Sequence, residues 1–267
     1  MSIIDDRVAP ALGLAAHLGR GMRRIGTDAA IGRLRRTPRT VADLDAAALA
    51  RLIGRPVASV EVIDGDAGTS SRARLTLTGD DVPASVFVKM AAETVATRLM
   101  GELGNLADTE TRFYRQLAPE LTGVPTSYGS AFDPWTGRFV LVLEDLADPC
   151  APPCEFPDTL HPIDPDRAAL VVELLAQLHR TFWGRLPQAA DTGPLGWVYS
   201  ASADSASLLT APLLRTSAQR MAQRTELPLE RGRFINENYR ALAALVDRGP
   251  HTVMHGDAHP GNVYFRA

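Results

Sequence analysis

The first periodic segment of the chain begins after residue 40. Thr40 and Asp43 have the spacing of a variant capping box at a helix N-terminus. Apolar side chains then recur at helical spacing, and Gly54 has the position of a helix C-cap. The stripe consists of Val41, Leu44, Ala48, Leu49 and Leu52. The pattern therefore predicts a helix that starts at Thr40 and ends at Gly54.

The period then changes from helical to two, which is typical of strands with one buried face. The alternating segments are 57–64 (VASVEVID), 72–78 (RARLTLT) and 85–90 (SVFVKM), and a glycine-rich connection, 65–71, joins the first two. Residues 138–144 (RFVLVLE) form the most strand-like segment of the chain. These segments predict a small antiparallel sheet built from hairpins.

A second helix is predicted over about 99–117, with one polar residue on its apolar face. Positions 106, 110, 113 and 117 lie on one side of a helix, so Glu110 points toward the core together with leucine and aromatic side chains. A carboxylate in that position needs a cation or several hydrogen-bond donors. Lys89, at the end of the third strand, is one candidate. Arg112 and Arg115 are others, and Glu102 is a rival partner for Lys89.

The remaining part of the chain has mostly helical signals. A proline-rich stretch, 149–165, is interpreted as a linker between two lobes. A helix follows from Asp164-Pro165 to Phe182. Further helices are predicted around 204–224 and 229–247, the latter ending at Gly249-Pro250. Short strands are predicted at 252–254 and 263–265.

Composition and charge exclude several classes of protein. With 267 residues, 45% hydrophobic and 22% charged, the chain has the balance of a globular protein, and its net charge of −3 gives no basic excess for nucleic acid. No apolar run is long enough for a membrane span. Two cysteines, Cys150 and Cys154, do not form a disulfide framework. We therefore expect a cytoplasmic protein without nucleic-acid or membrane partners.

The first 40 residues differ from this balance because seven arginines face a single acid, Asp28, between residues 20 and 40. An arm that binds nucleic acid or membrane is one interpretation. A solvated, partly helical extension is the other, and it is favoured because no aromatic residues alternate with the arginines.

One residue count is unusual. Lys89 is the only lysine among 28 basic residues. Lysine provides a compact point charge where arginine provides a wide planar fork. In a chain that otherwise uses arginine, this lysine marks a position where only a point charge serves, unless it persists by chance.

The segment His255–Asn262 (HGDAHPGN) carries three groups suited to chemistry, Asp257, His259 and Asn262. The spacing of Asp257 and Asn262 places a proton-accepting carboxylate one turn from a neutral oxygen ligand for a hard cation. As the simpler alternative, both side chains cap a tight turn. The GxxxxGK(S/T) signature is absent, which argues against a Walker-type NTPase.

The segment VMHGDAHPGNVYF resembles the catalytic loop of the aminoglycoside phosphotransferase and choline kinase superfamily, whose members are related to protein kinases and carry HGDxHxxN. Upstream elements follow in the family's order over about residues 40–267. Lys89 matches its phosphate-binding lysine, Glu110 the ion-pair partner, and 65–71 the hairpin over the phosphates. Leu143-Glu144-Asp145-Leu146 matches the hinge that offers backbone groups to adenine.

The resemblance implies ATP and Mg²⁺ as cofactors and a small-molecule hydroxyl as the phosphoryl acceptor. Asp257 would deprotonate or orient that hydroxyl, Asn262 would bind Mg²⁺, and His255 and His259 would brace the loop. His259 is expected as a core histidine and not as an acid or base. The nucleotide would contact Lys89, Glu110, Gly68, Thr69, Ser70, Ser71, Glu144 and Leu146.

The predicted fold is α+β, a protein-kinase-like two-lobed fold with a small antiparallel-sheet N-lobe and a mostly helical, incomplete C-lobe. Its parts are a basic, helical extension (1–40), a nucleotide-binding lobe (41–147) and the C-lobe with the catalytic loop (148–267). No acidic residue follows Asp257, so the family's second magnesium-binding aspartate has no counterpart. A shortened kinase is expected, with an oligomer or partner covering the C-lobe.

Two other functional classes remain open at this point. One is a catalytically impaired pseudokinase or nucleotide-binding protein. The other is a metal-dependent hydrolase with His255, Asp257 and His259 as ligands, which would give Lys89 no role.

Overall fold

The computed structural model describes residues 5–68, 70–158, 161–187, 193–198, 219–220 and 229–266. The chain divides into two compact units. One consists of Met1–Gly19 with Phe182–Val253, and the other of Arg20–Thr181 with Met254–Ala267. All predicted site residues belong to the second unit.

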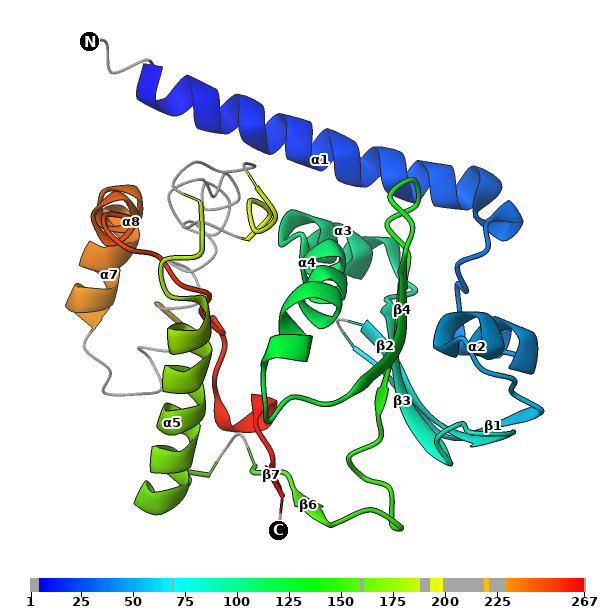
Figure 1. Ribbon diagram of the computed structural model, residues 1–267. Helices are drawn as coiled ribbons and strands as arrows, with labels where there is room; N and C mark the ends of the chain where they lie inside the picture. Colours follow the sequence, from blue (N-terminus) through cyan, green and yellow to red (C-terminus); the bar gives the residue numbers. More distant parts are fainter. Residues whose placement is uncertain are drawn as a thin grey trace. The chain divides into compact units, whose positions relative to one another are not determined.

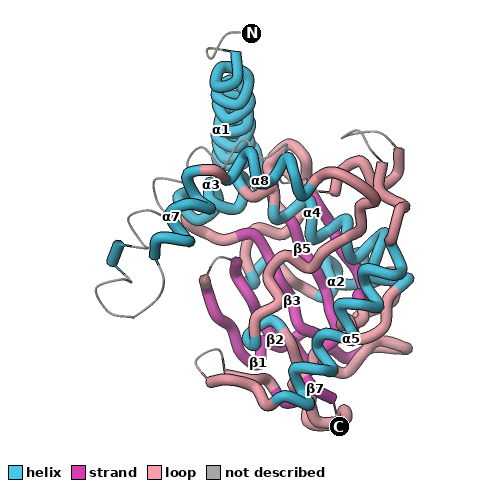
Figure 2. The backbone as a smooth tube through the Cα atoms, turned by 90° about the vertical axis from the view of Figure 1, so that its left-hand side faces the viewer, coloured by secondary structure: helices cyan, strands magenta, loops and turns pink. Residues whose placement is uncertain are grey.

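The second unit is built on a five-stranded antiparallel sheet with the order β1-β2-β3-β5-β4. Of these strands, Figure 2 labels β1, β2, β3 and β5. The strands are β1 (Ser59–Ala67), β2 (Ser70–Thr78), β3 (Ser85–Ala91), β4 (Ser127–Phe132) and β5 (Phe139–Glu144). Four of them correspond to predicted strands, whereas β4 was not predicted. All six positions of its sequence, SYGSAF, are partly buried, so buried and exposed side chains do not alternate along this strand. Without an alternation of apolar and polar residues, a sequence pattern does not identify a strand.

The two faces of this sheet have different covers (Figure 1). One face packs leucine, valine and methionine side chains against α2 (Ala46–Ile53) and the preceding η2 (Val41–Asp43). The other packs Phe139, Leu141 and Leu143 against α4 (Leu106–Arg112) and Tyr114. The sheet is therefore covered on both sides, and the helix that carries Glu110 lies on the second face.

The structure divides the helix predicted from Thr40 to Gly54 into a 3-10 turn and a separate α-helix. Asp43 accepts hydrogen bonds from the backbone and the hydroxyl of Thr40, as the capping box predicts, but only a 3-10 turn follows. Asp45 then caps α2 through the amide of Ala48, at 2.7 Å. The helix ends, as predicted, at Gly54, which has a left-handed φ of 76°.

The predicted helix 99–117 is also divided. It consists of α3 (Val95–Leu103), α4 and a π-helical turn, Phe113–Leu117. The break falls at Asn105, whose φ of 51° ends regular helix geometry. Tyr114, within the π-helical turn, packs against the sheet face that α4 covers.

The C-terminal half agrees with its helical signals where it is described. The helices are α5 (Pro165–Phe182), α7 (Leu229–Glu237) and α8 (Tyr239–Val246), and most of the predicted helix 204–224 lies outside the described residues. The predicted strand 252–254 is wrong, since these residues form no ladder. The stretch 149–165 is more than a linker, because β6 (Cys154–Glu155) pairs with β7 (Phe265–Arg266).

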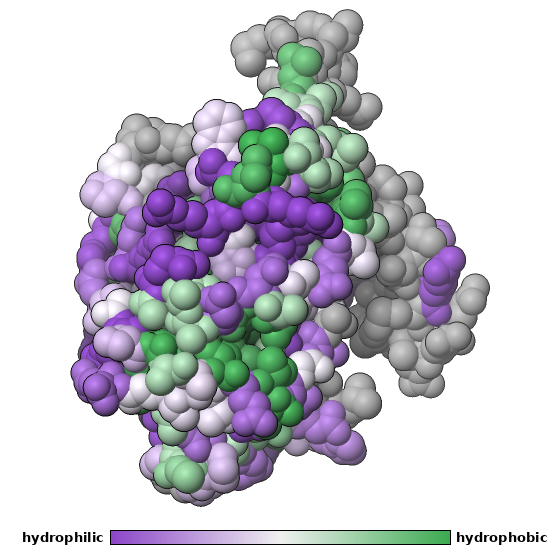
Figure 3. Space-filling view, turned by 90° about the vertical axis from the view of Figure 1, so that its right-hand side faces the viewer, coloured by the Kyte–Doolittle hydropathy of each residue, from purple (hydrophilic) through white to green (hydrophobic). Residues whose placement is uncertain are grey.

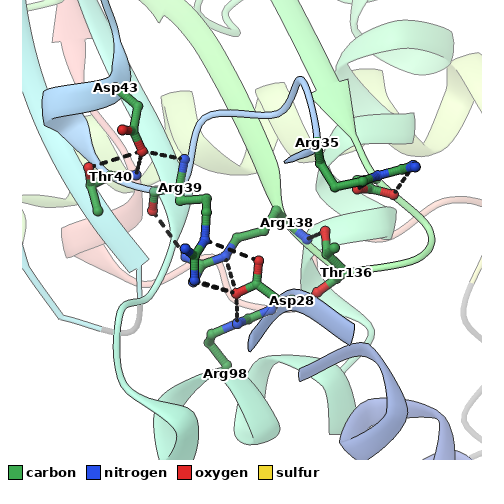
Figure 4. A network of polar contacts seen from close by, with 9 residues as sticks. Asp28, Arg35, Arg39, Thr40, Asp43, Arg98, Thr136 and Arg138 are labelled. Atoms are coloured by element: carbon green, nitrogen blue, oxygen red, sulfur yellow. Dashed lines mark hydrogen bonds and ion pairs between the residues drawn. The ribbon is translucent and has the colours of Figure 1, made fainter. Parts of the chain in front are cut away.

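The N-terminal segment is helical, as α1 (Asp5–Ile31), but its end is not solvated. Asp28 is 2% exposed. One of its carboxylate oxygens accepts hydrogen bonds from Arg98 of α3 at 2.6 Å and from Arg138 at 2.8 Å, and Arg39 lies 3.3 Å from the other (Figure 4). The interpretation of this segment as a solvated extension is therefore wrong around Asp28.

Burial alone would raise the pKa of Asp28, but the hydrogen bonds and charges of these arginines outweigh it and lower that pKa. A second ion pair, Arg24 to Glu102 at 2.7 Å, also joins the end of α1 to α3. Gly137 makes room for it, since a Cβ there would lie 2.1 Å from a Glu102 oxygen.

The outer surface near α2 and β1 is mixed in character. Figure 3 shows hydrophilic side chains in a band across the middle of this face, with hydrophobic side chains gathered below it. Among the described residues, no helix has the length and apolar character needed to cross a membrane.

Candidate active site

Lys89 lies on the sheet face that α4 covers. Side chains alternate along β3, so Phe87 and Lys89 point to the α4 face, and Val86, Val88 and Met90 point to the α2 face. Glu110 of α4 meets Lys89 there, with 2.7 Å between the Nζ and the Oε1 atoms. Both side chains are about one quarter exposed, so the ion pair can be reached by solvent.

The rival partners are occupied by other contacts. Glu102 pairs with Arg24, Arg112 pairs with Asp108 at 2.9 Å, and Arg115 donates to Ser130 at 2.9 Å. The expected pairing of Lys89 with Glu110 is therefore confirmed, and the alternatives are wrong as descriptions of the structure.

A second cation stands beside Lys89. Arg72 of β2 is directly opposite Lys89 in the ladder, and residues paired in this way share a face. The two like charges repel each other unless an anion lies between or above them. Arg72 was not predicted as a site residue, and only the register of β2 against β3 reveals it.

The connection between β1 and β2 is shorter than the predicted glycine-rich connection, 65–71. Gly65 is already within β1, opposite Ala73, and the amide of Gly68 donates to the Ser70 carbonyl at 3.0 Å. Thr69 lies outside the described residues. Ser70 pairs with Ala91 and therefore shares the face of Lys89.

Ser71 pairs with Met90 and points to the opposite face, where its buried hydroxyl has no hydrogen-bond partner among the described residues. Among the predicted hairpin residues that the structure describes, the register therefore places Ser70 on the face of Lys89 and Ser71 on the opposite face.

The loop 255–262 brings its polar groups together. The Asn262 side-chain nitrogen donates to both the backbone oxygen and the Oδ2 atom of Asp257, at 2.9 and 3.0 Å. With the amide nitrogen engaged in this way, the amide oxygen of Asn262 is the atom suited to a cation. The Asp257 side chain is 75% exposed, so its carboxylate is accessible to a substrate.

The two histidines of the loop act as hydrogen-bond acceptors for its backbone. The Nδ1 atom of His255 accepts from the amide of Asp257 at 3.3 Å, and that of His259 accepts from Gly261 at 3.1 Å. The expected bracing is present. His259 is nevertheless 47% exposed, so it is not a core histidine.

The geometry gives no support to a three-ligand metal centre. His259 Nε2 is 3.8 Å from Asp257 Oδ2. Within the described part of the chain, no three His, Cys, Asp or Glu side chains are grouped so that they could hold a metal ion.

The residues that follow the loop tie it to the sheet. Arg266 pairs with Glu144, the last residue of β5, at 2.6 Å. Burial alone would raise the pKa of Glu144, but hydrogen bonds from the Thr126 amide and from Arg266 lower it. The side chain of this predicted hinge residue is therefore committed to holding the end of the loop.

Tyr114 of the π-helical turn packs against the sheet face that α4 covers. Burial raises the pKa of Tyr114, and the charges of Glu110 and Tyr264 raise it further. The Lys89–Glu110 pair and the Asp257 loop both belong to the second unit.

The segment after β5, the predicted hinge, carries a buried network that the sequence did not reveal. Asp145 is buried and receives hydrogen bonds from Arg74 of β2 and Ser85 of β3. Arg74 and Ser85 are 71 and 60 residues away from Asp145, so no local pattern indicates these contacts.

Comparison with known proteins agrees with this arrangement. A model of the phosphotransferase enzyme family matches residues 23–267, which includes the sheet, α4 and the loop. Neither the curated proteins nor the solved structures contain a match. Because the family match covers most of the chain, the protein belongs to the phosphotransferase enzyme family.

Proposed function

We propose that the protein transfers the γ-phosphoryl group of ATP to the hydroxyl of a small molecule. The observation that carries the proposal is the 2.7 Å pair between Glu110 and Lys89, the only lysine of the chain, on the sheet whose strand β5 is tied to the end of the Asp257 loop by the Arg266–Glu144 pair. In phosphoryl transfer, most of the catalysis comes from positioning the reactants and neutralising phosphate charge.

Each residue has a defined part in this reaction. Lys89, held by Glu110, contacts the α- and β-phosphates, and Arg72 adds positive charge beside it. Asp257 accepts the proton of the acceptor hydroxyl as that oxygen bonds to the γ-phosphorus. The bond from the γ-phosphorus to the β,γ-bridging oxygen breaks, which gives ADP and a phosphomonoester.

Magnesium fits the residues that are present. Asn262 would hold Mg²⁺ through its amide oxygen, and the metal would neutralise charge on the β- and γ-phosphates. His255 and His259 keep the backbone of the loop in place for this contact.

The test is acceptor-dependent formation of ADP. The protein is incubated with ATP, Mg²⁺ and separate panels of aminoglycosides, choline-like alcohols, sugars and lipid-like alcohols, and phosphorus NMR identifies the product. A phosphomonoester of one panel is the expected result. ATP binding without acceptor-dependent ADP would instead indicate a nucleotide-binding protein, and absence of ATP binding would reject both.

A further inference from the structure

The segment after β5 is fixed by an unusually complete set of hydrogen bonds. Asp145 is 2% exposed. Both of its oxygens accept from Arg74, at 3.0 to 3.1 Å, and Ser85 donates to one of them at 2.8 Å. The amide of Ala147 donates to the same side chain at 3.1 Å.

Arg74 also holds the backbone of this segment directly. Its Nη2 atom donates to the Ala147 carbonyl at 2.8 Å. The amide and the carbonyl of Ala147 are therefore both fixed, one by Asp145 and the other by Arg74. Leu146 lies between two pinned residues, so its backbone has little freedom.

The same network connects this segment to the strand of Lys89. Ser85 and Lys89 are four residues apart on β3, about 14 Å along a strand. Glu144 is paired with Val86, next to Ser85, and Leu141 is paired with Lys89. One strand, β3, therefore connects the segment after β5 with Lys89.

We infer that Asp145 is a positioning residue for the nucleobase: with Arg74 and Ser85, it holds the backbone of residues 144–147 at a fixed distance from Lys89. This inference rests on the proposed function, because it assigns the nucleobase to that backbone and the phosphates to Lys89. Asp145 itself uses both oxygens within the protein and does not contact the nucleotide.

The chain offers a matched control on the other side of β5. Asp133 is 3% exposed and pairs with Arg35 through two hydrogen bonds, at 2.8 and 3.1 Å. It also accepts from the amide two residues later, that of Trp135, at 3.0 Å. Asp133 thus resembles Asp145 in burial, in its arginine partner and in its turn contact, but it lies before β5, away from the hinge.

The experiment measures three probes by titration calorimetry, namely ATP, adenosine and inorganic tripolyphosphate, on the full chain. Asp145→Asn should weaken ATP and adenosine about tenfold and leave tripolyphosphate unchanged, since a charge-assisted network is lost only at the nucleobase end. Asp133→Asn should leave all three affinities unchanged. In turnover, Asp145→Asn should raise the KM for ATP and keep kcat.

Several outcomes would overturn the inference. Equal affinities in Asp145→Asn and Asp133→Asn would do so, as would an equal loss for all three probes in Asp145→Asn. If wild-type protein binds ATP and these results are obtained, only the inference fails. If wild-type protein does not bind ATP, the proposed function fails with it.

A milder variant covers the case in which Asp145→Asn does not fold. Ser85→Ala removes one hydrogen bond to Asp145 and leaves the Arg74 pair in place. It should weaken adenosine and ATP about threefold, with tripolyphosphate unchanged. Unchanged adenosine affinity in a folded Ser85→Ala protein would contradict the inference.

Discussion

Two carboxylates of this chain, Asp28 and Asp257, differ in their exposure to solvent and in the groups that contact them. Asp28 is 2% exposed and is surrounded by three arginines, whereas the Asp257 side chain is 75% exposed and is held by Asn262. A buried charge needs complete pairing, and removal of its partners is costly. An exposed carboxylate stays available for a proton. The comparison separates a residue that holds the fold from one that is suited to chemistry.

The largest expected effect is on turnover at Asp257. Asp257→Ala should lower kcat about a thousandfold or more, within the range for loss of a general base, because no other group of the loop replaces the carboxylate. The midpoint of thermal unfolding should stay within about 2 °C, since exposed substitutions change stability little. Steady-state kinetics and a thermal scan measure both quantities.

Asp80→Asn is the control for that variant, because Asp80 is also exposed and lies in the turn after β2. It should retain wild-type turnover. Full activity in Asp257→Ala would remove the aspartate from the mechanism.

The second effect is on stability at Asp28. Asp28→Ala leaves Arg98 and Arg138 buried without their counter-ion, and removal of one member of a buried ion pair costs about 3–5 kcal/mol. Urea unfolding followed by circular dichroism should show this loss. A change below about 1 kcal/mol would mean that the network is not a stabilising feature.

The third effect is the acid dependence of stability. The pKa values of Asp28, Asp133 and Asp145 are lowered from the ordinary value of 3.8, in each case because arginine contacts outweigh burial. Their contribution is therefore present above pH 3.8 and is lost as the pH falls from there through the lowered folded-state values.

Unfolding free energies measured between pH 6 and pH 3 test this dependence. The unfolding free energy of Asp28→Asn should decrease less with falling pH than that of the wild type, because one of the three aspartates with a lowered pKa has been removed. An identical slope in the two proteins would contradict the lowered pKa of Asp28.

The smallest effect is at a third carboxylate, Asp43, which is exposed and accepts hydrogen bonds from the backbone of Arg39 and Thr40 at 2.9 Å. Asp43→Ala should cost about 1 kcal/mol, the usual contribution of a capping side chain. Urea unfolding measures it. A loss of unfolding free energy as large as that of Asp28→Ala would show that the exposure of these two carboxylates does not determine how much each contributes to stability.

The sequence allowed prediction where the relevant pattern is local. The alternation along 85–90 predicted the strand of Lys89, and the helical spacing of 106, 110, 113 and 117 placed Glu110 on the face that meets it. The loop 255–262 was identifiable because its polar groups lie within eight residues of one another.

Contacts between distant segments were not predictable in this way. Asp28 and Arg138 are 110 residues apart, and Glu144 and Arg266 are 122 apart. With 27 arginines in the chain, each acid has many possible partners, and sequence spacing does not choose among them. The position of Arg72 opposite Lys89 likewise follows only from the register of β2 against β3.

The most direct test of the central claim compares the affinity of Mg²⁺–ATP for two variants by titration calorimetry. Lys89→Met should weaken binding about tenfold or more, because the point charge on the phosphates is lost. Asp257→Asn should bind within about twofold of the wild type, because its carboxylate acts on the acceptor hydroxyl. Unchanged affinity in Lys89→Met, or an equal loss in both variants, would contradict the account.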